Sequence, residues 1–145
     1  MNKLFKISGK NNILSALNDF QSIFPHLIEK IDDLDSYADK LSRFAEVYCA
    51  YKDDRMFGLL VLYANDIENK KAYITLIGVK KDFEHMGLGK YLLNEAMNIA
   101  RTRGMKHIKL EVDNDNLHAV EFYERNGFCV CGETQNNSKY MINKL

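Results

Sequence analysis

The stretch from residue 72 to residue 112 limits the possible folds most, because its hydrophobic period changes twice. Ala72 to Val79 is rich in β-branched and aromatic residues, which is typical of a central strand. The next segment repeats its apolar residues every three or four positions up to a glycine, which predicts an amphipathic helix. His107 to Val112 then alternates charged and apolar residues, as a half-exposed strand does. A right-handed crossover would make the strands that hold Ile74 and Leu110 parallel neighbours.

The N-terminal part of the chain is predicted to form helices and then strands. Asn11 to Glu46 carries apolar residues near the 3.6-residue period twice, which indicates two helices. Asp33 and Ser36 are both plausible starts for the second helix. Val47 to Tyr51 and Met56 to Tyr63 flank a polar turn, so we expect a hairpin that continues into the strand at residue 72 as a meander.

The C-terminal part resumes the alternation and completes the fold. Leu117 to Asn126 has helical spacing with Gly127 as its cap, and Phe128 to Gly132 and Lys139 to Ile142 flank a polar turn. We therefore expect an α/β fold with a mixed, mostly antiparallel twisted sheet and helices on both faces. With one proline and no repeat or low-complexity tract, residues 1–145 are expected to form a single domain.

The charge balance disfavours two classes of partner, which would need a local charged patch. Twenty basic and twenty acidic residues cancel, so no whole-molecule field exists to hold nucleic acid or an anionic membrane. No window approaches the roughly 18 apolar residues of a membrane span. We expect a cytoplasmic protein with neither nucleic acid nor membrane as a partner.

The three cysteines indicate neither a disulfide framework nor a metal site. Cys49, Cys129 and Cys131 form an odd set without metal-ligand spacing. We interpret them as small apolar packing residues and expect no metal.

A glycine-containing loop, Glu84 to Lys90, lies between the central strand and the strongest helix. Glycines let backbone amides approach a ligand, and the first turn of a helix offers free N–H groups to a phosphate. A dinucleotide fingerprint would need a third glycine where Leu92 stands, and a P-loop would need Ser or Thr where Tyr91 stands. Two glycines at such a turn also serve purely structural ends in many proteins.

Two blocks of residues resemble the GNAT superfamily of acyl-CoA-dependent N-acyltransferases. Gly87 and Gly89 fill the glycines of its phosphate loop, Q/R-x-x-G-x-G/A. Asn116 to Ala119, followed by Phe122 to Phe128, is similar to its later N-x-x-A-x-x-ϕ-Y-e-x-x-G-F segment. Glu84 departs from the pattern, because the family usually has Gln or Arg there and a carboxylate repels phosphate unless it points away.

The resemblance implies acetyl-CoA as cosubstrate and assigns residues to it. The backbone of Ile77, Gly78 and Val79 would pair with the pantetheine arm like an added strand. Asn116 would contact the coenzyme, although an Asn at this position also suits a helix cap. The pyrophosphate would lie on the loop residues His85, Met86, Gly87, Leu88, Gly89 and Lys90.

Tyr123 and Glu111 are the candidate catalytic residues. By resemblance, Tyr123 is the general acid that protonates the departing thiolate, although a helix aromatic is often simply packed in the core. Glu111 is the candidate general base for the amine, since some family members carry a glutamate at this strand position. The alternation along the strand would also leave Glu111 exposed without any role.

The resemblance implies an N-acetyltransferase that moves an acetyl group to a primary amine of a small molecule or protein. A non-catalytic acyl-CoA-binding sensor or interaction domain with the same fold is the alternative. A nucleotide-binding oxidoreductase is a more distant rival, because it leaves the Asn116 to Phe128 block unexplained. We expect a monomer or homodimer.

Overall fold

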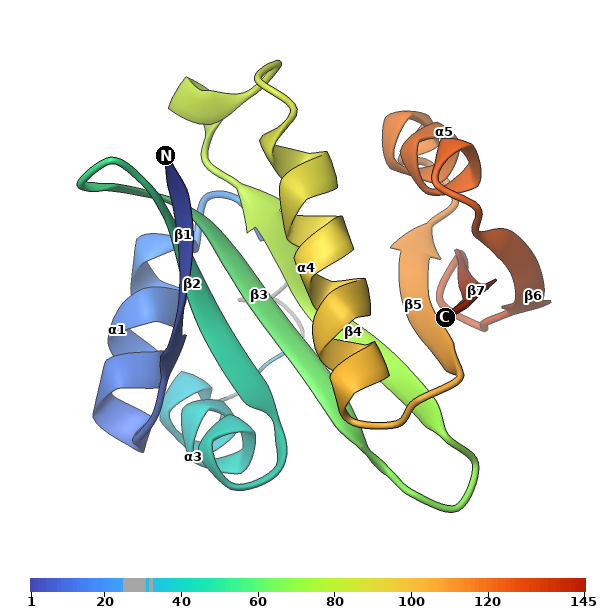
Figure 1. Ribbon diagram of the computed structural model, residues 1–145, viewed down its shortest axis with the longest axis horizontal. Coiled ribbons are helices and arrows are strands. Elements are labelled where there is room, and N and C mark those ends of the chain that lie inside the picture. Colours follow the sequence, from blue (N-terminus) through green and yellow to red (C-terminus); the bar gives the residue numbers. More distant parts are fainter. Residues whose placement is uncertain (25–30, 32) are drawn as a thin grey trace.

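The computed structural model describes residues 1–24, 31 and 33–145. Its strands form one seven-stranded sheet in the order β1-β2-β3-β4-β5-β7-β6 (Figure 1). Neighbouring strands pair antiparallel except β4 and β5, which are parallel, and this confirms the predicted mixed sheet. In sheet order the strands are β1 (Asn2–Ile7), β2 (Glu46–Lys52), β3 (Arg55–Asp66), β4 (Lys71–Val79), β5 (His107–Asp113), β7 (Ser138–Lys144) and β6 (Cys129–Glu133).

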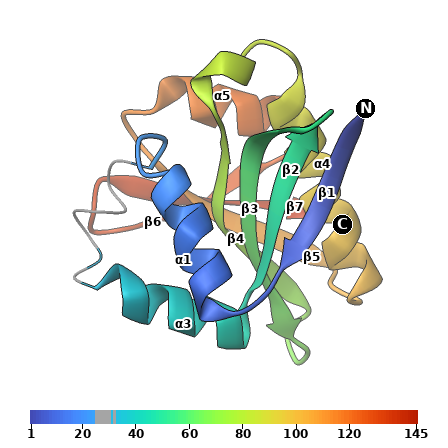
Figure 2. The same ribbon diagram turned by 90° about the vertical axis from the view of Figure 1, so that its left-hand side faces the viewer.

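Helices cover both faces of the sheet, as predicted (Figure 2). Side chains alternate along β3, so that Leu59 and Val61 join the core under α1 and α3 while Leu60 and Leu62 join the core under α4 and α5. Residues 25–30 and 32 of the predicted helical segment lie outside the described residues. The helices are α1 (Lys10–Asp19), α3 (Leu34–Phe44), α4 (Leu88–Thr102) and α5 (Leu117–Arg125), with a short 3-10 helix η1 (Lys81–Phe83) before α4.

The helix predicted after the glycine loop is α4, and its apolar stripe anchors it. Leu88, Leu92, Ala96 and Ala100 are spaced one turn apart, and none is more than 3% exposed. Their burial against the sheet holds the start of α4 in a fixed position. Gly104 follows the helix with a φ of 81°, a backbone conformation that costs glycine little.

β4 and β5 pair over only the first half of their length. Residues 71–74 pair with residues 107–110, and Ile74 lies opposite Leu110 as the parallel crossover predicted. Beyond Ile74 the two strands part (Figure 1). The separation begins where Thr75 is skipped in the pairing of β4 with β3, which marks a β-bulge.

Two features of the outer strands differ from the sequence reading. The patterns did not predict β1, a six-residue edge strand in which no residue is fully buried. Cys49 is buried as expected, but Cys129 and Cys131 are exposed, so that part of the interpretation is wrong. Both lie on β6, an edge strand with a register shift between Val130 and Gly132 that leaves Cys131 outside the ladder.

A charged cluster ties β2 to the C-terminal end of α4. Arg103 contacts both carboxylate oxygens of Glu46, with N–O distances of 2.6 Å and 3.1 Å. Burial alone would raise the pKa of Glu46, but hydrogen bonds from Arg103 and Tyr48 hold that pKa below its usual value. The cluster lies where β2 begins and α4 ends, at the opposite end of α4 from the glycine loop.

Candidate active site

The gap between the parted strands exposes backbone groups of β4. The N–H of Lys80 donates to the carbonyl of Phe57 on β3 at 2.8 Å. Because backbone groups alternate in direction along a strand, those of Val79 and Ile77 face the opposite side, toward the gap. The site therefore offers strand-type donors and acceptors to an extended ligand.

The glycine loop adds a second set of free backbone donors. Gly87 is the N-cap of α4 and has a φ of 74°, in the left-handed region that favours glycine. The first intrahelical hydrogen bond joins the N–H of Tyr91 to the carbonyl of Gly87, so the N–H groups of the three residues between them are left for other partners. His85 also has a positive φ, 64°, which marks the loop as locally strained.

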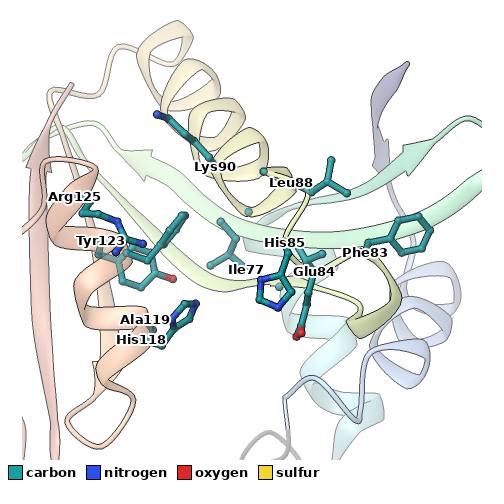
Figure 3. A pocket seen from close by; sticks show the side chains of 15 residues that line it. Ile77, Phe83, Glu84, His85, Leu88, Lys90, His118, Ala119, Tyr123 and Arg125 are labelled. Atoms are coloured by element: carbon teal, nitrogen blue, oxygen red, sulfur yellow. The ribbon is translucent and has the colours of Figure 1, made fainter.

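A cavity of about 740 Å³ lies between the loop, the end of β4 and α5 (Figure 3). Lys90 and Arg125 bring positive charge to its wall, and Glu84 brings negative charge. Gly89 has no side chain, and a Cβ there would meet the ring of Phe122 at 3.7 Å. Its wall is formed by Ile77, Gly78, Val79, Phe83, Glu84, His85, Gly87, Leu88, Gly89, Lys90, His118, Ala119, Phe122, Tyr123 and Arg125. We call this the loop cavity.

A second cavity of about 1060 Å³ opens on the other side of the gap. Its wall includes the carboxylates of Glu111, Asp113 and Asp115 and the rings of Tyr37 and Tyr73. No Lys, Arg or His is among its described lining residues. We call this the acidic cavity, and the two cavities share Ile77, Ala119 and Tyr123.

Tyr123 therefore lies where the two cavities meet. Its ring packs against Phe122 and Phe128, with ring centroids 5.4 Å and 5.7 Å away. Figure 3 shows its hydroxyl directed into the space that His85 and His118 also face. Burial raises the pKa of Tyr123 to about 12, so the phenol stays protonated at neutral pH.

Glu111 lies on the wall of the acidic cavity, on the half of β5 that has parted from β4. Its side chain is exposed, and Ser138 on β7 donates a hydrogen bond of 2.6 Å to its Oε2. Together with burial, the Glu111 charge raises the pKa of Tyr73 to about 12, burial being the larger cause. Glu111 thus borders the acidic cavity from β5, and Tyr123 borders both cavities from α5.

Most residues assigned to the coenzyme from the sequence line the loop cavity, but two do not. Met86 is 50% exposed and is not among the lining residues. Asn116 lines the acidic cavity instead, and its Oδ1 caps α5 by accepting from the N–H of Ala119 at 3.2 Å. Neither residue therefore lines the loop cavity, unlike the rest of the set.

The sequence reading did not assign three loop-cavity residues of α5 to the coenzyme site. His118, Phe122 and Arg125 are spaced i, i+4 and i+7, so they share one face of the helix with Tyr123 beside them. That spacing is visible in the sequence and would have identified the face. Tyr37 on α3 gave no such signal, because it reaches the acidic cavity through tertiary packing alone.

Two kinds of feature are absent from the described residues. No helix among them is long and apolar enough to cross a membrane. No group of three or more His, Cys, Asp or Glu side chains among them is arranged to hold a metal ion.

Solved structures share this architecture. The PaiA N-acetyltransferase of Thermoplasma acidophilum, in complex with coenzyme A, covers 100% of the chain and 99% of its own, with a TM-score of 0.75 and 22% identity. A Bacillus anthracis protein assigned as a streptothricin acetyltransferase, in complex with acetyl coenzyme A, is 31% identical, with a TM-score of 0.62. That alignment covers 70% of this chain and 63% of the other.

Sequence comparison agrees with the structural comparison. The spermine/spermidine N(1)-acetyltransferase of Bacillus subtilis is 30% identical over 92 residues, which are 62% of this chain and 60% of that protein. This chain thus spans 56–60% of the length of that protein and of two further curated relatives. The profile of the acetyltransferase (GNAT) family matches residues 13–128, which include both the glycine loop and the later tyrosine block. The chain belongs to the GNAT acetyltransferase family.

Proposed function

We propose that the chain binds acetyl-CoA in the loop cavity and transfers its acetyl group to an amine held in the acidic cavity. One observation carries the proposal: two cavities of different character meet at Tyr123, Ile77 and Ala119. A group-transfer enzyme needs two adjoining sites of this kind, so that donor and acceptor meet in a fixed orientation. Relatives named as N-acetyltransferases, one of them solved with acetyl coenzyme A, support the reaction class.

The loop cavity fits an acyl-CoA. The free N–H groups that follow Gly87, at the positive end of α4, would hold the pyrophosphate, with Lys90 and Arg125 nearby as cations. The backbone groups of Ile77 and Val79 that face the gap would pair with the extended arm of the coenzyme. The residues present would therefore supply both a phosphate contact and a strand-type contact to such a ligand.

The acidic cavity favours a cationic acceptor. The carboxylates of Glu111 and Asp115, in a wall whose described residues include no Lys, Arg or His, would attract a protonated amine, and the rings of Tyr37 and Tyr73 add surfaces for a cation or an alkyl chain. Spermine and streptothricin, named for two relatives, belong to this chemical class. We propose a primary amine of a small molecule, with an amine of a protein as the second possibility.

Glu111 and Tyr123 are the two side chains that would accept and donate protons in the reaction. Glu111 on the acidic cavity wall would accept the proton that the amine loses, directly or through water. Tyr123 would donate a hydrogen bond to the departing sulfur. Transfer from a phenol of pKa about 12 to a thiolate whose own pKa is about 8.5 is uphill, so the Tyr123 proton would move late, as charge develops on the sulfur.

A non-catalytic acyl-CoA sensor remains the second candidate, and Glu84 favours it. The carboxylate of Glu84 lines the loop cavity, where it opposes a phosphate. Coenzyme binding without turnover of any amine, or no coenzyme binding at all, would fit such a non-catalytic domain.

We also propose that residues 1–145 form a single domain, because one sheet runs through them. A cytoplasmic location and a monomeric or homodimeric state stay predictions.

The first experiment is a calorimetric titration with acetyl-CoA, desulfo-CoA and NAD. We expect both CoA compounds to bind and NAD not to bind, because the loop lacks the third glycine of a dinucleotide site. An amine panel with detection of released thiol then follows, from spermidine to a neutral aryl amine. Failure of both CoA compounds to bind would refute the proposal, and binding without thiol release would favour the sensor.

A further inference from the structure

One hydroxyl next to the acidic cavity has no exposed surface. Ser138, the first residue of β7, is the one polar residue that is fully buried among the residues the structure describes. Burying a hydroxyl is unfavourable unless its hydrogen bonds are made. The partners of Ser138 therefore explain why a polar residue is tolerated in this position.

The hydrogen bonds of Ser138 have a defined direction. Its Oγ donates to Glu111 Oε2 at 2.6 Å, and it also shares a hydrogen bond with the hydroxyl of Thr134. Since the single proton of Ser138 is given to Glu111, Thr134 must be the donor of the second bond. Thr134 Oγ1 in turn accepts from the N–H of Asn136 at 3.1 Å. Three donors in a row thus point toward one carboxylate.

The strand register brings this chain of donors to the site. Ser138 lies opposite Asp113 on β5, and Glu111 is two residues away on the same face, within reach of a diagonal contact. The carbonyl of Ser138 accepts from the N–H of Thr134 at 3.0 Å, which closes the turn between β6 and β7. A turn that the sequence marks only as polar is therefore built into the wall of the acidic cavity.

We infer that Ser138, supported by Thr134, is a positioning residue that holds the carboxylate of Glu111 toward the acceptor amine. The inference rests on the proposed function, in which Glu111 faces that amine. An exposed glutamate otherwise samples several rotamers, and ordering it costs side-chain entropy. Ser138 occupies Oε2 and leaves Oε1 to accept an N–H of the amine. Charge-assisted hydrogen bonds of this kind are stronger than neutral ones, so Ser138 holds the ionised carboxylate more firmly than it would hold a neutral carboxyl group.

A double-mutant cycle tests the inference through initial rates with saturating acetyl-CoA and a titrated amine. We expect Ser138→Ala to lower kcat/KM for the amine about tenfold, the effect of one lost hydrogen bond to a charged group, with acetyl-CoA affinity unchanged. In the Glu111→Gln background, the same substitution should have almost no effect. An equal loss in both backgrounds, or no loss in the wild-type background, would overturn the inference.

Thr134→Val is the graded control, because Ser138 keeps its bond to Glu111 while losing the donor behind it. We expect a loss smaller than that of Ser138→Ala. Thermal unfolding of each variant shows whether it is folded.

A measurement without turnover separates this inference from the proposed function. Carbon-13 relaxation of the Glu111 side chain should show a more ordered carboxylate in the wild type than in Ser138→Ala. Equal mobility in both proteins would refute the positioning role. Absence of any amine acetylation would refute the proposed function, and the relaxation data would still decide the role of Ser138.

Discussion

Substituting Gly87 by alanine separates the structural from the ligand-binding use of one glycine, because the chain supplies a matched control. Gly87 and Gly104 flank α4 with φ values of 74° and 81°, and a Cβ at either would meet no atom within 4 Å. Alanine in this region is strained by about 1–2 kcal/mol, partly offset by a less flexible unfolded chain. Each variant should therefore lose about 1 kcal/mol of unfolding free energy, or about 3 °C in Tm.

The two variants should differ in their affinity for acetyl-CoA. Gly87 lines the loop cavity, so a methyl group there occupies space next to the free N–H groups of α4. Losing one charge-assisted hydrogen bond to the pyrophosphate costs about 1.5–3 kcal/mol, which is about a 10- to 150-fold rise in Kd. Gly104 lies at the other end of the helix.

Calorimetric titration of acetyl-CoA into both variants, with thermal denaturation of the same samples, checks this prediction. Gly104→Ala should bind as the wild type does, at a similar cost in Tm. If Gly87→Ala also binds within twofold of the wild type, the loop does not hold the pyrophosphate. If both variants bind weakly, the effect is one of general stability and the reasoning from cavity geometry is wrong.

Three further predictions concern Tyr123 as the general acid, the packing around Gly78 on β4, and the ion pair between Arg103 and Glu46. Tyr123→Phe keeps the ring packing and should lower kcat at least 100-fold without loss of Tm, whereas Tyr91→Phe, outside both cavities, should leave kcat unchanged. Gly78→Ala would place a Cβ 2.7 Å from an aromatic ring of the segment after α1, so we expect a lower Tm and an altered amine KM. Arg103→Met should cost about 1 kcal/mol at pH 7 in denaturant unfolding. Because the folded-state pKa of Glu46 is lowered, that loss should be full above pH about 4.5 and shrink as the pH falls through the folded pKa; a pH-independent loss would refute the assignment.

Much of the fold follows from short-range patterns. The parallel neighbours Ile74 and Leu110 and the helix that packs Leu92 into the core depend on period and chirality, which a single sequence displays. The edge strand β1 was missed because edge residues are half exposed, which weakens the alternation on which strand prediction depends.

The finer geometry of the site depends on contacts between distant residues. The bulge at Thr75 arises from the register with β3, and no local signal marks it. Ser138 reads as a turn residue, and its bond to Glu111, 27 positions away, exists only once β7 pairs with β5. The glycine loop and Tyr123 were identified from the sequence because family motifs, which record tertiary contacts indirectly, supplied what period alone does not.

The bulge at Thr75 divides β4 into two halves that differ in their backbone hydrogen bonds. Residues before the bulge pair with β5, whereas residues after it pair only with β3 and leave the backbone groups on their other edge unpaired by β5. On the proposed function, this half of β4 would bind the coenzyme through backbone N–H and C=O groups, which every amino acid except proline can supply. Ile77, which borders both cavities, would help shape the acceptor site. Side chains on this half of the strand would then be free to change with the acceptor, because donor recognition does not depend on them. The one-residue bulge would thus allow substitutions on this half of β4 to change the acceptor that is bound without changing the coenzyme.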